Sequence, residues 1–443
     1  MSKNSIKVKL NIQCGITQTN YNLLKKYINE KLNKDKTSFK TTNDEPTPVE
    51  CAEEMLGYIP VEFWEKNDIS ILDPCSGYGN LLVPVYNYLK QNHTDKDILE
   101  NILHFNEINT QRIDILKKIF EYKTFNLNIT NLDFLKFNND IKYDLQIVNP
   151  PYAKFNEIID SNGIKRMKRA SKNHTLVRDF IQKSLDICKD GGYIIYIVPN
   201  NWMSLADRNK IIKDLTQYQF IHLDIAACKK YFPKIGSSFT YFIIKKIPFY
   251  KDFTVKCLYN KKNYTSMVKS QKRDFIPLLY SNMVQSILNK VLNSANEKLL
   301  IETTSDLHKY TKKHLINKNC DETFKYRLIH TDKQTVYASR AHKYQMGWKV
   351  FLSTTGKWNI FIDNDCGMTQ SIAFVRVGNK EEATKIKKIL DHNLYRFINN
   401  ICRWGNFNCI RILQRMPKPQ NIDDIYSSFD ITDDERTFIE DNV

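Results

Sequence analysis

The chain has 443 residues and a hydrophobic fraction of 42%, which is enough for two domains with a core each. It has no apolar run of the length that a transmembrane helix needs, and its charged N-terminus has no apolar signal segment, so we expect neither a membrane span nor secretion. The ten cysteines form no Cys-x-x-Cys pair, as expected of reduced thiols in a cytoplasmic protein.

The formal net charge of +17 is concentrated in one part of the chain. Residues 251–418 carry 30 basic and 13 acidic residues, whereas residues 419–443 carry one basic and eight acidic residues. A basic half of this kind suits a polyanion such as DNA or RNA. A genome that overuses lysine codons would produce the same excess, so charge alone leaves both explanations open.

Residues 1–46 have the composition of a polar leader with one amphipathic helix at 21–32. From 47 to 250, apolar segments alternate with helical patterns, which predicts an α/β domain with a largely parallel sheet and helices on both faces. Ligands of such sheets bind at the carboxyl ends of the strands. The expected strands are 69–75, 102–108, 143–151, 191–199 and 240–246, and the expected helices are 47–56, 109–122, 175–192 and 208–218.

The alternation is lost beyond residue 250, where a second domain of mixed α+β structure is expected over 251–443, with its boundary within 247–275. Strands are predicted at 347–353 and 371–377, and one long helix at 380–401. Tryptophan and tyrosine residues lie between basic residues throughout this region.

The segment "ILDPCSGYGNLL" (71–82) predicts a strand that ends at Asp73, a loop with Gly77 and Gly79, and then a helix. Two such glycines let the backbone pass close to a ligand, and the helix N-terminus offers free N–H groups. No Lys-Ser/Thr follows, as a phosphate-binding loop requires, and Leu82 stands where a dinucleotide loop has its third glycine. Alone, the segment is explained equally well as a tight strand-to-helix turn.

Two acidic residues follow the next segments. Glu107 ends the strand expected in "HFNEIN" (104–109), where a carboxylate can hold the two hydroxyls of a ribose. A carboxylate that stabilises a helix N-terminus is the common alternative. In "NLDFLKF" (131–137), Asp133 precedes Phe134, which we expect to be exposed, and the pair can bond the amino group of a purine and stack on its ring.

The segment "DLQIVNPPYAKF" (144–155) contains two consecutive prolines after a hydrophobic strand. Proline has no N–H to donate and restricts its predecessor, so the strand must end at Val148 or Asn149. The rigid turn that follows presents an amide and an aromatic ring, Asn149 and Tyr152. A plain strand terminator is the alternative.

In this order, the four segments resemble the S-adenosylmethionine-dependent amino methyltransferases. "TPVECAEEM" (47–55), a Thr-Pro helix before the glycine loop, narrows the resemblance to the gamma class of DNA adenine-N6 methyltransferases of restriction–modification systems. Segments 177–203 and 231–246 look like the motifs that follow in that family. The resemblance covers roughly 47–246 and implies a Rossmann-like methyltransferase sheet in 47–250, with a C-terminal target-recognition domain in 251–443.

The resemblance also implies a role for individual residues. Those expected to bind S-adenosylmethionine are Thr47 at its methionine part, Asp73, Pro74, Gly77 and Gly79 in the loop, Glu107 at the ribose, and Asp133 with Phe134 at the adenine. Those expected to face the target base are Asn149, Pro150, Pro151 and Tyr152, with Phe232 as a second aromatic. Two features depart from the family: Asn80 stands where a small residue is usual, and the interval from Asp73 to Glu107 is lengthened near 87–101.

The four residues Asn149, Pro150, Pro151 and Tyr152 form the tetrad that would face the base, and the chemistry of adenine explains why they would be needed. The N6 lone pair is delocalised into the ring, so the nitrogen is a poor nucleophile. The side-chain oxygen of Asn149 and the carbonyl of Pro150 can accept both amino hydrogens, which favours a pyramidal nitrogen aimed at the sulfonium methyl. Positioning and electrostatics then supply most of the acceleration. The base must leave the duplex, and Tyr152 would stack on it.

Double-stranded DNA is the expected partner. The segment after the tetrad is expected to be either a loop that clamps phosphates or a solvated charged loop, and its basic residues are Lys165, Arg166, Lys168 and Arg169. "RWGNFN" (403–408) and "RILQRMPKP" (411–419) loosely resemble late segments of the same family, so Arg403 and Trp404 are expected to contact DNA.

Other substrates and roles stay open at this point. The tetrad also suits RNA or a protein glutamine, whose side chain presents a similar planar NH2, and a modification subunit that is inactive without a partner is a further alternative. No Pro-Asp…Asp/Glu-x-Lys nuclease constellation is evident, and 46 leader residues are too few for a nuclease domain, so a separate cognate restriction endonuclease is a candidate partner. No metal site is expected.

Overall fold

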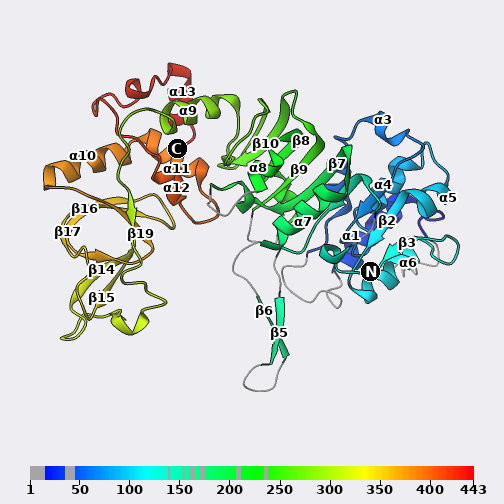
Figure 1. Cartoon of the computed structure of the whole chain (residues 1–443), viewed down its shortest axis with the longest axis horizontal. Helices are drawn as coiled ribbons and strands as arrows, with labels where there is room; N and C mark the ends of the chain where they lie inside the picture. Colours follow the sequence, from blue (N-terminus) through cyan, green and yellow to red (C-terminus); the bar gives the residue numbers. More distant parts are fainter. Residues whose placement is uncertain are drawn as a thin grey trace, which may run out of the picture. The chain divides into compact units, whose positions relative to one another are not determined.

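The computed structural model describes residues 15–34, 45–137, 140–152, 155–159, 165–169, 175–205, 211–233 and 238–443. The chain divides into two compact units (Figure 1). The first comprises residues 1–199, 213–256 and 269–272, and the second comprises residues 200–212, 257–268 and 273–443. No helix among the described residues combines the length and the apolarity needed to cross a bilayer.

The largest sheet has nine strands in the order β11-β10-β8-β9-β7-β4-β1-β2-β3 (Figure 1). β1 pairs in parallel with both β2 and β4, β4 pairs in parallel with β7, and β9 is antiparallel to β7 and β8. The strand order therefore reverses at β1, which is the point where doubly wound sheets bind ligands. The strands are β1 (Ile71–Asp73), β2 (Leu103–Asn106), β3 (Asn128–Thr130), β4 (Tyr143–Val148), β7 (Cys188–Pro199), β8 (Tyr218–Ile225), β9 (Phe239–Pro248), β10 (Phe253–Tyr259) and β11 (Lys262–Val268).

Helices cover both faces of this sheet, which confirms the predicted α/β class. On one face, alternate strand residues such as Phe105 and Ile147 are buried in a core that includes side chains of α1, α2, α4 and α6. On the other face, α7 contributes Ser184, whose carbonyl accepts a hydrogen bond from Gln146 Nε2 at 2.8 Å. The helices of this part are α1 (Tyr21–Glu30), η1 (Leu32–Lys34), α2 (Val49–Leu56), α3 (Val61–Trp64), α4 (Leu82–Leu89), α5 (Asp95–Asp97), η2 (Ile98–Ile102), α6 (Thr110–Ile119), η3 (Phe134–Lys136), α7 (Thr175–Ile187), α8 (Ile211–Leu215) and η5 (Ala227–Tyr231).

The helix expected at 175–192 is too long at its C-terminal end. α7 ends at Ile187, and β7 begins at Cys188, which pairs with Tyr143 of β4. The strand bulges between this pair and the next, which accommodates Gly191 with its positive φ of 80°. Sheet pairing therefore overrides the local helical pattern from Cys188 onward. The sequence also did not predict β8 (Tyr218–Ile225), which begins at the last residue of the helix expected at 208–218.

The second unit contains two four-stranded sheets, β12-β19-β16-β17 and β13-β15-β14-β18. Its strands are β12 (Glu302–Thr303), β13 (Ile316–Asn317), β14 (Tyr326–Thr331), β15 (Gln334–Ala338), β16 (Met346–Ser353), β17 (Ile360–Asp365), β18 (Gly367–Met368) and β19 (Ile372–Arg376). Its helices are η4 (Asn200–Met203), α9 (Asn282–Leu292), η6 (Lys313–Leu315), α10 (Lys380–Asp391), α11 (Asn393–Cys402), α12 (Ile410–Leu413), η7 (Ser427–Phe429) and α13 (Asp433–Glu440).

The prediction of a single helix at 380–401 is wrong. The segment forms two helices, α10 and α11, which are separated at His392. His392 has an extended backbone, with φ −65° and ψ 144°, and its Nδ1 accepts a hydrogen bond from the N–H of Leu394 at 3.3 Å. A side-chain cap of this kind satisfies an N–H that has no partner within the first turn of a helix. Histidine is not among the preferred capping residues, so the sequence pattern contained no signal for the break.

The N-terminal helix α1 is part of the core of the first unit. Leu24 and Ile28 are buried in the same cluster as α2 and α4, although the region around them is polar. Tyr21 and Lys25 donate hydrogen bonds to Glu53 of α2 at 2.7 and 2.6 Å. α1 is thus a structural support for the segment that begins with Thr47.

Replacement of Ile28 by alanine should lower the free energy of unfolding by about 2–5 kcal/mol, because it leaves a cavity at a fully buried position. Leu23 on the same helix is 52% exposed, so Leu23→Ala should change stability by less than about 0.5 kcal/mol. Urea unfolding followed by circular dichroism measures both values. Equal effects of the two changes would show that α1 does not dock as described.

Candidate functional site

Several predicted site residues of the first unit lie at the carboxyl ends of β1, β2 and β4. These strands end at Asp73, Asn106 and Val148, and they are neighbours in the parallel part of the sheet. Because parallel strands end at the same edge, the loops that follow them meet there. The glycine loop, Glu107 and Asn149 therefore belong to one region of the fold.

The glycine loop and Glu107 are in direct contact. Glu107 is 4% exposed, and its Oε2 accepts a hydrogen bond from the N–H of Gly77 at 2.8 Å, while Oε1 accepts one from the N–H of Asn109 at 2.8 Å. Asn109 is the N-cap of α6, so the carboxylate also stabilises a helix start, the alternative role considered from the sequence. A carboxylate oxygen has two lone pairs and can accept more than one hydrogen bond.

Asp73 carries a buried acceptor that none of the described residues satisfies. Its Oδ1 accepts a hydrogen bond from the N–H of Cys75 at 3.0 Å, but Oδ2 is buried and has no partner among the described residues. Burial raises the pKa of the Asp73 carboxyl well above its ordinary value; the Cys75 N–H opposes the shift and the charge of Glu107 adds to it. Such an arrangement is costly for the fold by itself and suits a ligand that donates to this oxygen.

Asn106 joins two of the loops and was not predicted from the sequence. Its Nδ2 donates to the carbonyl of Pro74 at 3.0 Å and to the carbonyl of Leu132 at 3.1 Å. One buried amide thereby ties the glycine loop to the loop that carries Asp133. The only sequence signal is a polar residue at the end of an apolar strand.

Asp133 caps a short helix, and Phe134 is buried although its ring was expected to be exposed. Asp133 caps η3, with Oδ1 accepting from the N–H of Leu135 at 3.1 Å. Phe134 is 2% exposed and packs against Phe137 and Phe180, with ring centroids 6.1 and 5.2 Å away, so the expectation of an exposed ring is wrong. The aromatic ring is part of the core because η3 turns it away from solvent. Contact of this pair with a cofactor stays a prediction.

Asn149 lies within a network that defines the orientation of its amide. Nδ2 donates to Thr47 Oγ1 at 2.9 Å and to the carbonyl of Glu45 at 3.2 Å. Oδ1 accepts a hydrogen bond from the hydroxyl of Tyr152 at 2.6 Å. The structure thus brings together Thr47, Asn149 and Tyr152, which the sequence predicted separately. The nitrogen of Asn149 is engaged by the fold, and its oxygen is directed towards Tyr152.

An aromatic row extends from Tyr152. The ring of Tyr152 lies 5.7 Å from that of Phe239, which lies 5.3 Å from that of Phe232. Phe239 was not predicted, because as the first residue of β9 it reads as an ordinary strand residue. It connects the tetrad to Phe232, which is 4% exposed.

The segment before Phe232 is anchored to α2. Glu54 of α2 is the anchor, and burial opposes its ionisation while three hydrogen bonds lower its pKa to about 2. The donors are Lys230 Nζ at 2.6 Å, Tyr231 Oη at 2.7 Å and Tyr241 Oη at 2.9 Å. The helix that follows Thr47 is therefore tied to the turn that carries the second aromatic.

We predicted a loop for the basic segment after the tetrad, but the segment contains two strands. β5 (Phe155–Ile159) and β6 (Lys165–Arg169) form a two-stranded antiparallel sheet. Lys165, Arg166, Lys168 and Arg169 all belong to β6. Their side chains lie outside the described part of the structure, so their contact with DNA stays a prediction.

In the second unit, residues 404–407 form a tight turn with an exposed aromatic at its end. Trp404 and Phe407 exchange backbone hydrogen bonds at 3.1 and 3.0 Å, and their rings stack at 4.8 Å. Phe407 is 47% exposed. Arg403 is half-buried and donates to the carbonyl of Gly356 at 2.9 Å, so it supports the turn. Phe407 is therefore the large side chain that the turn presents to solvent.

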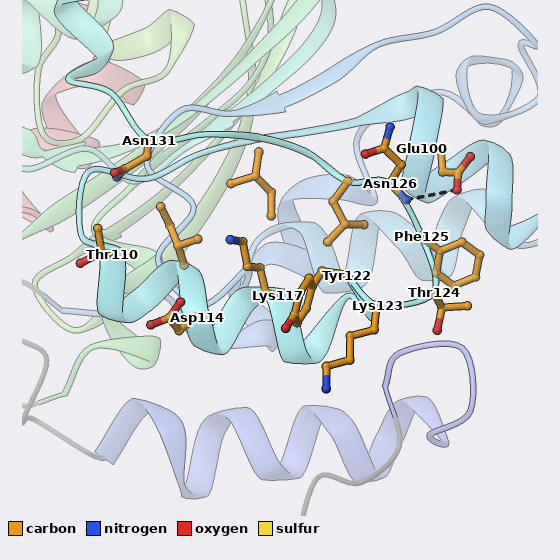
Figure 2. A pocket seen from close by; sticks show the side chains of 13 residues that line it. Glu100, Thr110, Asp114, Lys117, Tyr122, Lys123, Thr124, Phe125, Asn126 and Asn131 are labelled. Atoms are coloured by element: carbon orange, nitrogen blue, oxygen red, sulfur yellow. Dashed lines mark hydrogen bonds between the residues drawn. The ribbon is translucent and has the colours of Figure 1, made fainter.

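A separate hollow of about 680 Å³ lies beside α6 (Figure 2). Its lining includes side chains of both charges, such as Glu100, Asp114, Lys117 and Lys123. Figure 2 shows the carboxylate of Glu100 bonded to the N–H of Asn126, at 3.1 Å. None of the predicted site residues is among the described residues that line it. The mixed charge indicates no particular ligand.

Comparison with known proteins identifies the class of this fold and site. The sequence model of the Eco57I restriction-modification methylases matches residues 6–227, which is half of the chain. The chain belongs to the Eco57I restriction-modification methylase family. The resemblance to methyltransferases of restriction–modification systems is thereby confirmed, while its narrower assignment to the gamma class stays a prediction.

Individual relatives are distant. The type II methyltransferase M.AccI of Acinetobacter calcoaceticus is 30% identical over 118 residues, 24% of this chain and 22% of that protein. The uncharacterized protein YtxK of Bacillus subtilis (strain 168) is 26% identical over 157 residues, 35% of this chain and 45% of that protein. The chain thus spans less than half of the length of either. The cryo-EM structure of a DrdV–DNA complex has a TM-score of 0.55 at 10% identity, over 96% of this chain and 60% of that one, which shows a shared fold.

Replacement of Gly79 by alanine should destabilise the first unit by about 2 kcal/mol or more, because the new Cβ would lie 2.3 Å from the ring of Phe120 and φ is +88°. Gly77 also has a positive φ, +54°, but apart from its chain neighbours no described residue has an atom within 4 Å of an added Cβ. Gly77→Ala should therefore cost only about 1 kcal/mol. Urea unfolding separates the two, and a larger effect at Gly77 would contradict the close approach of Phe120.

Proposed function

We propose that the protein is a sequence-specific DNA adenine-N6 methyltransferase that uses S-adenosylmethionine. The observation that carries this proposal is the state of the Asn149 amide. Its nitrogen is bonded to Thr47 and Glu45, and its oxygen accepts a hydrogen bond from the hydroxyl of Tyr152, which an entering donor could replace. An acceptor held in this way, beside an aromatic ring, suits the exocyclic amine of a planar base.

The residues at the ends of β1 and β2 fit the proposed cofactor. Asp73 offers a buried oxygen without a partner among the described residues, and the Glu107 carboxylate can accept from ribose hydroxyls. Gly77, Gly79 and Pro74 would line the same loop, with Thr47 near the methionine part and Asp133 and Phe134 near the adenine. S-adenosylmethionine supplies the methyl group as a sulfonium electrophile.

The amine of the target adenine would be oriented by acceptors. We expect Asn149 Oδ1 and the carbonyl of Pro150 to accept its two hydrogens, which withdraws the nitrogen lone pair from the ring and aims it out of the base plane. Pro151 adds to the stiffness of the backbone that holds these acceptors. No strong base is required, because positioning and electrostatics lower the barrier.

The hydroxyl of Tyr152 occupies Asn149 Oδ1, at 2.6 Å. The entering amine would replace this hydroxyl, while the ring of Tyr152, with Phe239 and Phe232 behind it, would stack on the base. The base reaches this pocket only after it has flipped out of the duplex. Tyr152 would thus keep the acceptor satisfied until a base arrives.

Three observations support DNA as the substrate. The family is one of restriction–modification methylases, the neighbour DrdV is described in a complex with DNA, and the basic excess of residues 251–418 suits a polyanion. We propose residues 251–443 as the target-recognition domain and residues 47–250 as the catalytic domain. Double-stranded DNA, and a separate cognate restriction endonuclease, are the proposed partners.

The test is methyl transfer by the purified chain from tritiated S-adenosylmethionine to duplex DNA, total RNA and protein, followed by sequencing of modified adenines. We expect label in DNA, at adenines of one sequence. Asn149→Ala should lose transfer by about 100-fold or more while it retains the cofactor. Label confined to RNA or to a protein glutamine would overturn the proposal, and label in DNA only after addition of a second protein would identify a partner-dependent subunit.

Tyr152 should separate stacking from hydrogen bonding. Tyr152→Phe retains the ring and removes the hydroxyl that competes for Asn149 Oδ1, so we expect kcat/KM for DNA to stay within about threefold of the wild type. Tyr152→Ala removes the ring and should lower kcat/KM by about 5- to 150-fold, since stacking contributes about 1–3 kcal/mol per base. A loss in Tyr152→Phe as large as in Tyr152→Ala would contradict this division of roles.

Phe407 should contribute to duplex binding, because an exposed ring on a rigid turn that Arg403 supports suits stacking against a base. Phe407→Ala should weaken binding by about 5- to 150-fold in a fluorescence-anisotropy titration at fixed salt. Tyr122, also 47% exposed but in the first unit, provides the control, and Tyr122→Ala should leave affinity unchanged. Equal losses would exclude a specific role of the turn.

A further inference from the structure

Asn80 occupies an unusual position in the glycine loop. It is 5% exposed, and its Nδ2 donates twice, to the carbonyl of Thr47 at 2.8 Å and to Asn33 Oδ1 at 2.8 Å. Its own Oδ1 is buried and has no partner among the described residues. A buried acceptor without a partner is unfavourable for a fold. Among the described residues, the Asn80 amide acts as a donor only.

The hydrogen bond from Asn80 to Thr47 connects Asn80 to Asn149. The backbone carbonyl of Thr47 is held by Asn80, and the side-chain Oγ1 of the same residue accepts from Asn149 Nδ2 at 2.9 Å. A shift of the Thr47 peptide would therefore move the partner of the Asn149 amide. Sequence alone gives no sign of this link, because Thr47 and Asn149 are 102 positions apart.

The orientation of Asn80 is in turn set by residues of α1, η1 and α2. Asn33 presents its oxygen to Asn80 because its Nδ2 faces Asn29 Oδ1, at 3.4 Å. Asn29 is oriented by Glu50, whose carboxylate accepts from Asn29 Nδ2 at 2.7 Å. A carboxylate and a backbone carbonyl only accept, so the donations run outward from Asn80, through Asn33 and Asn29 to Glu50 on one side and directly to Thr47 on the other.

The contacts of Asn149 decide the orientation of its amide. An asparagine side chain can rotate by 180°, which exchanges the positions of its oxygen and its nitrogen. The hydroxyl of Thr47 can donate or accept, so it tolerates either orientation of Asn149. The carbonyl of Glu45 accepts only the NH2, at 3.2 Å. In the wrong orientation, Asn149 would present its NH2 to the amine of the substrate, donor against donor.

We infer that Asn80, supported by Asn33, is a positioning residue that fixes the Thr47 peptide. It thereby holds the segment whose Glu45 carbonyl and Thr47 hydroxyl accept from the Asn149 amide. The inference rests on the proposed function for its kinetic consequence, but its structural part concerns the protein alone.

The first test observes the amide of Asn149 directly. With selectively ¹⁵N-labelled asparagine, the side-chain NH2 signal of Asn149 is identified as the one that disappears in Asn149→Ala. We expect Asn80→Ala to shift this signal and to reduce its protection from hydrogen exchange. Asn128→Ala is the matched control: Asn128 also donates to two carbonyls, those of Glu100 at 2.7 Å and Leu103 at 3.3 Å. An Asn149 signal that Asn80→Ala leaves unchanged would overturn the inference.

The second test separates catalysis from binding. Asn80→Ala should lower kcat for methyl transfer to DNA by about 10- to 100-fold, with the affinity for S-adenosylhomocysteine changed by less than about threefold in calorimetry. Asn33→Leu should have a similar effect, whereas Asn33→Asp, which still offers an acceptor to Asn80, should retain kcat within about threefold. Equal losses of kcat and cofactor affinity in Asn80→Ala would indicate a collapsed loop and contradict positioning.

Failure of the inference is distinguishable from failure of the proposed function. A wild-type chain that transfers no methyl group to DNA defeats the proposed function, and the Asn149 signal in Asn80→Ala then decides the positioning role alone. Active wild-type protein with an unchanged signal and an unchanged kcat in Asn80→Ala defeats only the positioning role.

Discussion

The site of this protein depends on acceptor groups that surround the nitrogen of one amide. Asn149 follows the last residue of β4, and its Nδ2 meets the hydroxyl of Thr47 and the carbonyl of Glu45. Because a carbonyl cannot donate, the amide has one stable orientation, with its oxygen towards Tyr152. The role proposed for the tetrad requires this orientation, and most of the surrounding polar contacts serve to maintain it.

Buried carboxylates are the second constraint. Asp73 has an oxygen without a partner among the described residues, and Glu107 binds the N–H groups of Gly77 and Asn109. Burial of these groups opposes folding of the free protein, since charge in a low-dielectric interior is unfavourable without compensation. A ligand that donates hydrogen bonds to them would relieve part of this cost, which couples cofactor binding to the stability of the first unit.

The second unit has a tight turn with an exposed aromatic ring. Its turn at 404–407 is held by backbone pairing and by Arg403, so the exposed ring of Phe407 projects from a rigid base. The basic residue that the sequence singled out supports the turn from within, and the aromatic three positions after Trp404 is the one exposed. Rigid presentation limits the conformational entropy lost when a partner binds.

The α/β class, the order of the motifs and the end of β4 could be predicted from the amino-acid sequence. The two prolines stop the strand whatever surrounds them, and alternation of apolar segments with helical patterns requires a sheet covered on both faces. These are local properties, which short stretches of sequence determine. Strand pairing and packing prevailed where they competed with local preference. β7 begins at Cys188, inside the helix predicted at 175–192, His392 divides a continuous helical pattern, and Phe134 is buried. Only the fold brings Thr47 to Asn149 and Asn33 to Asn80, because such contacts join positions far apart in the chain, and no local pattern records which carbonyl an amide will find.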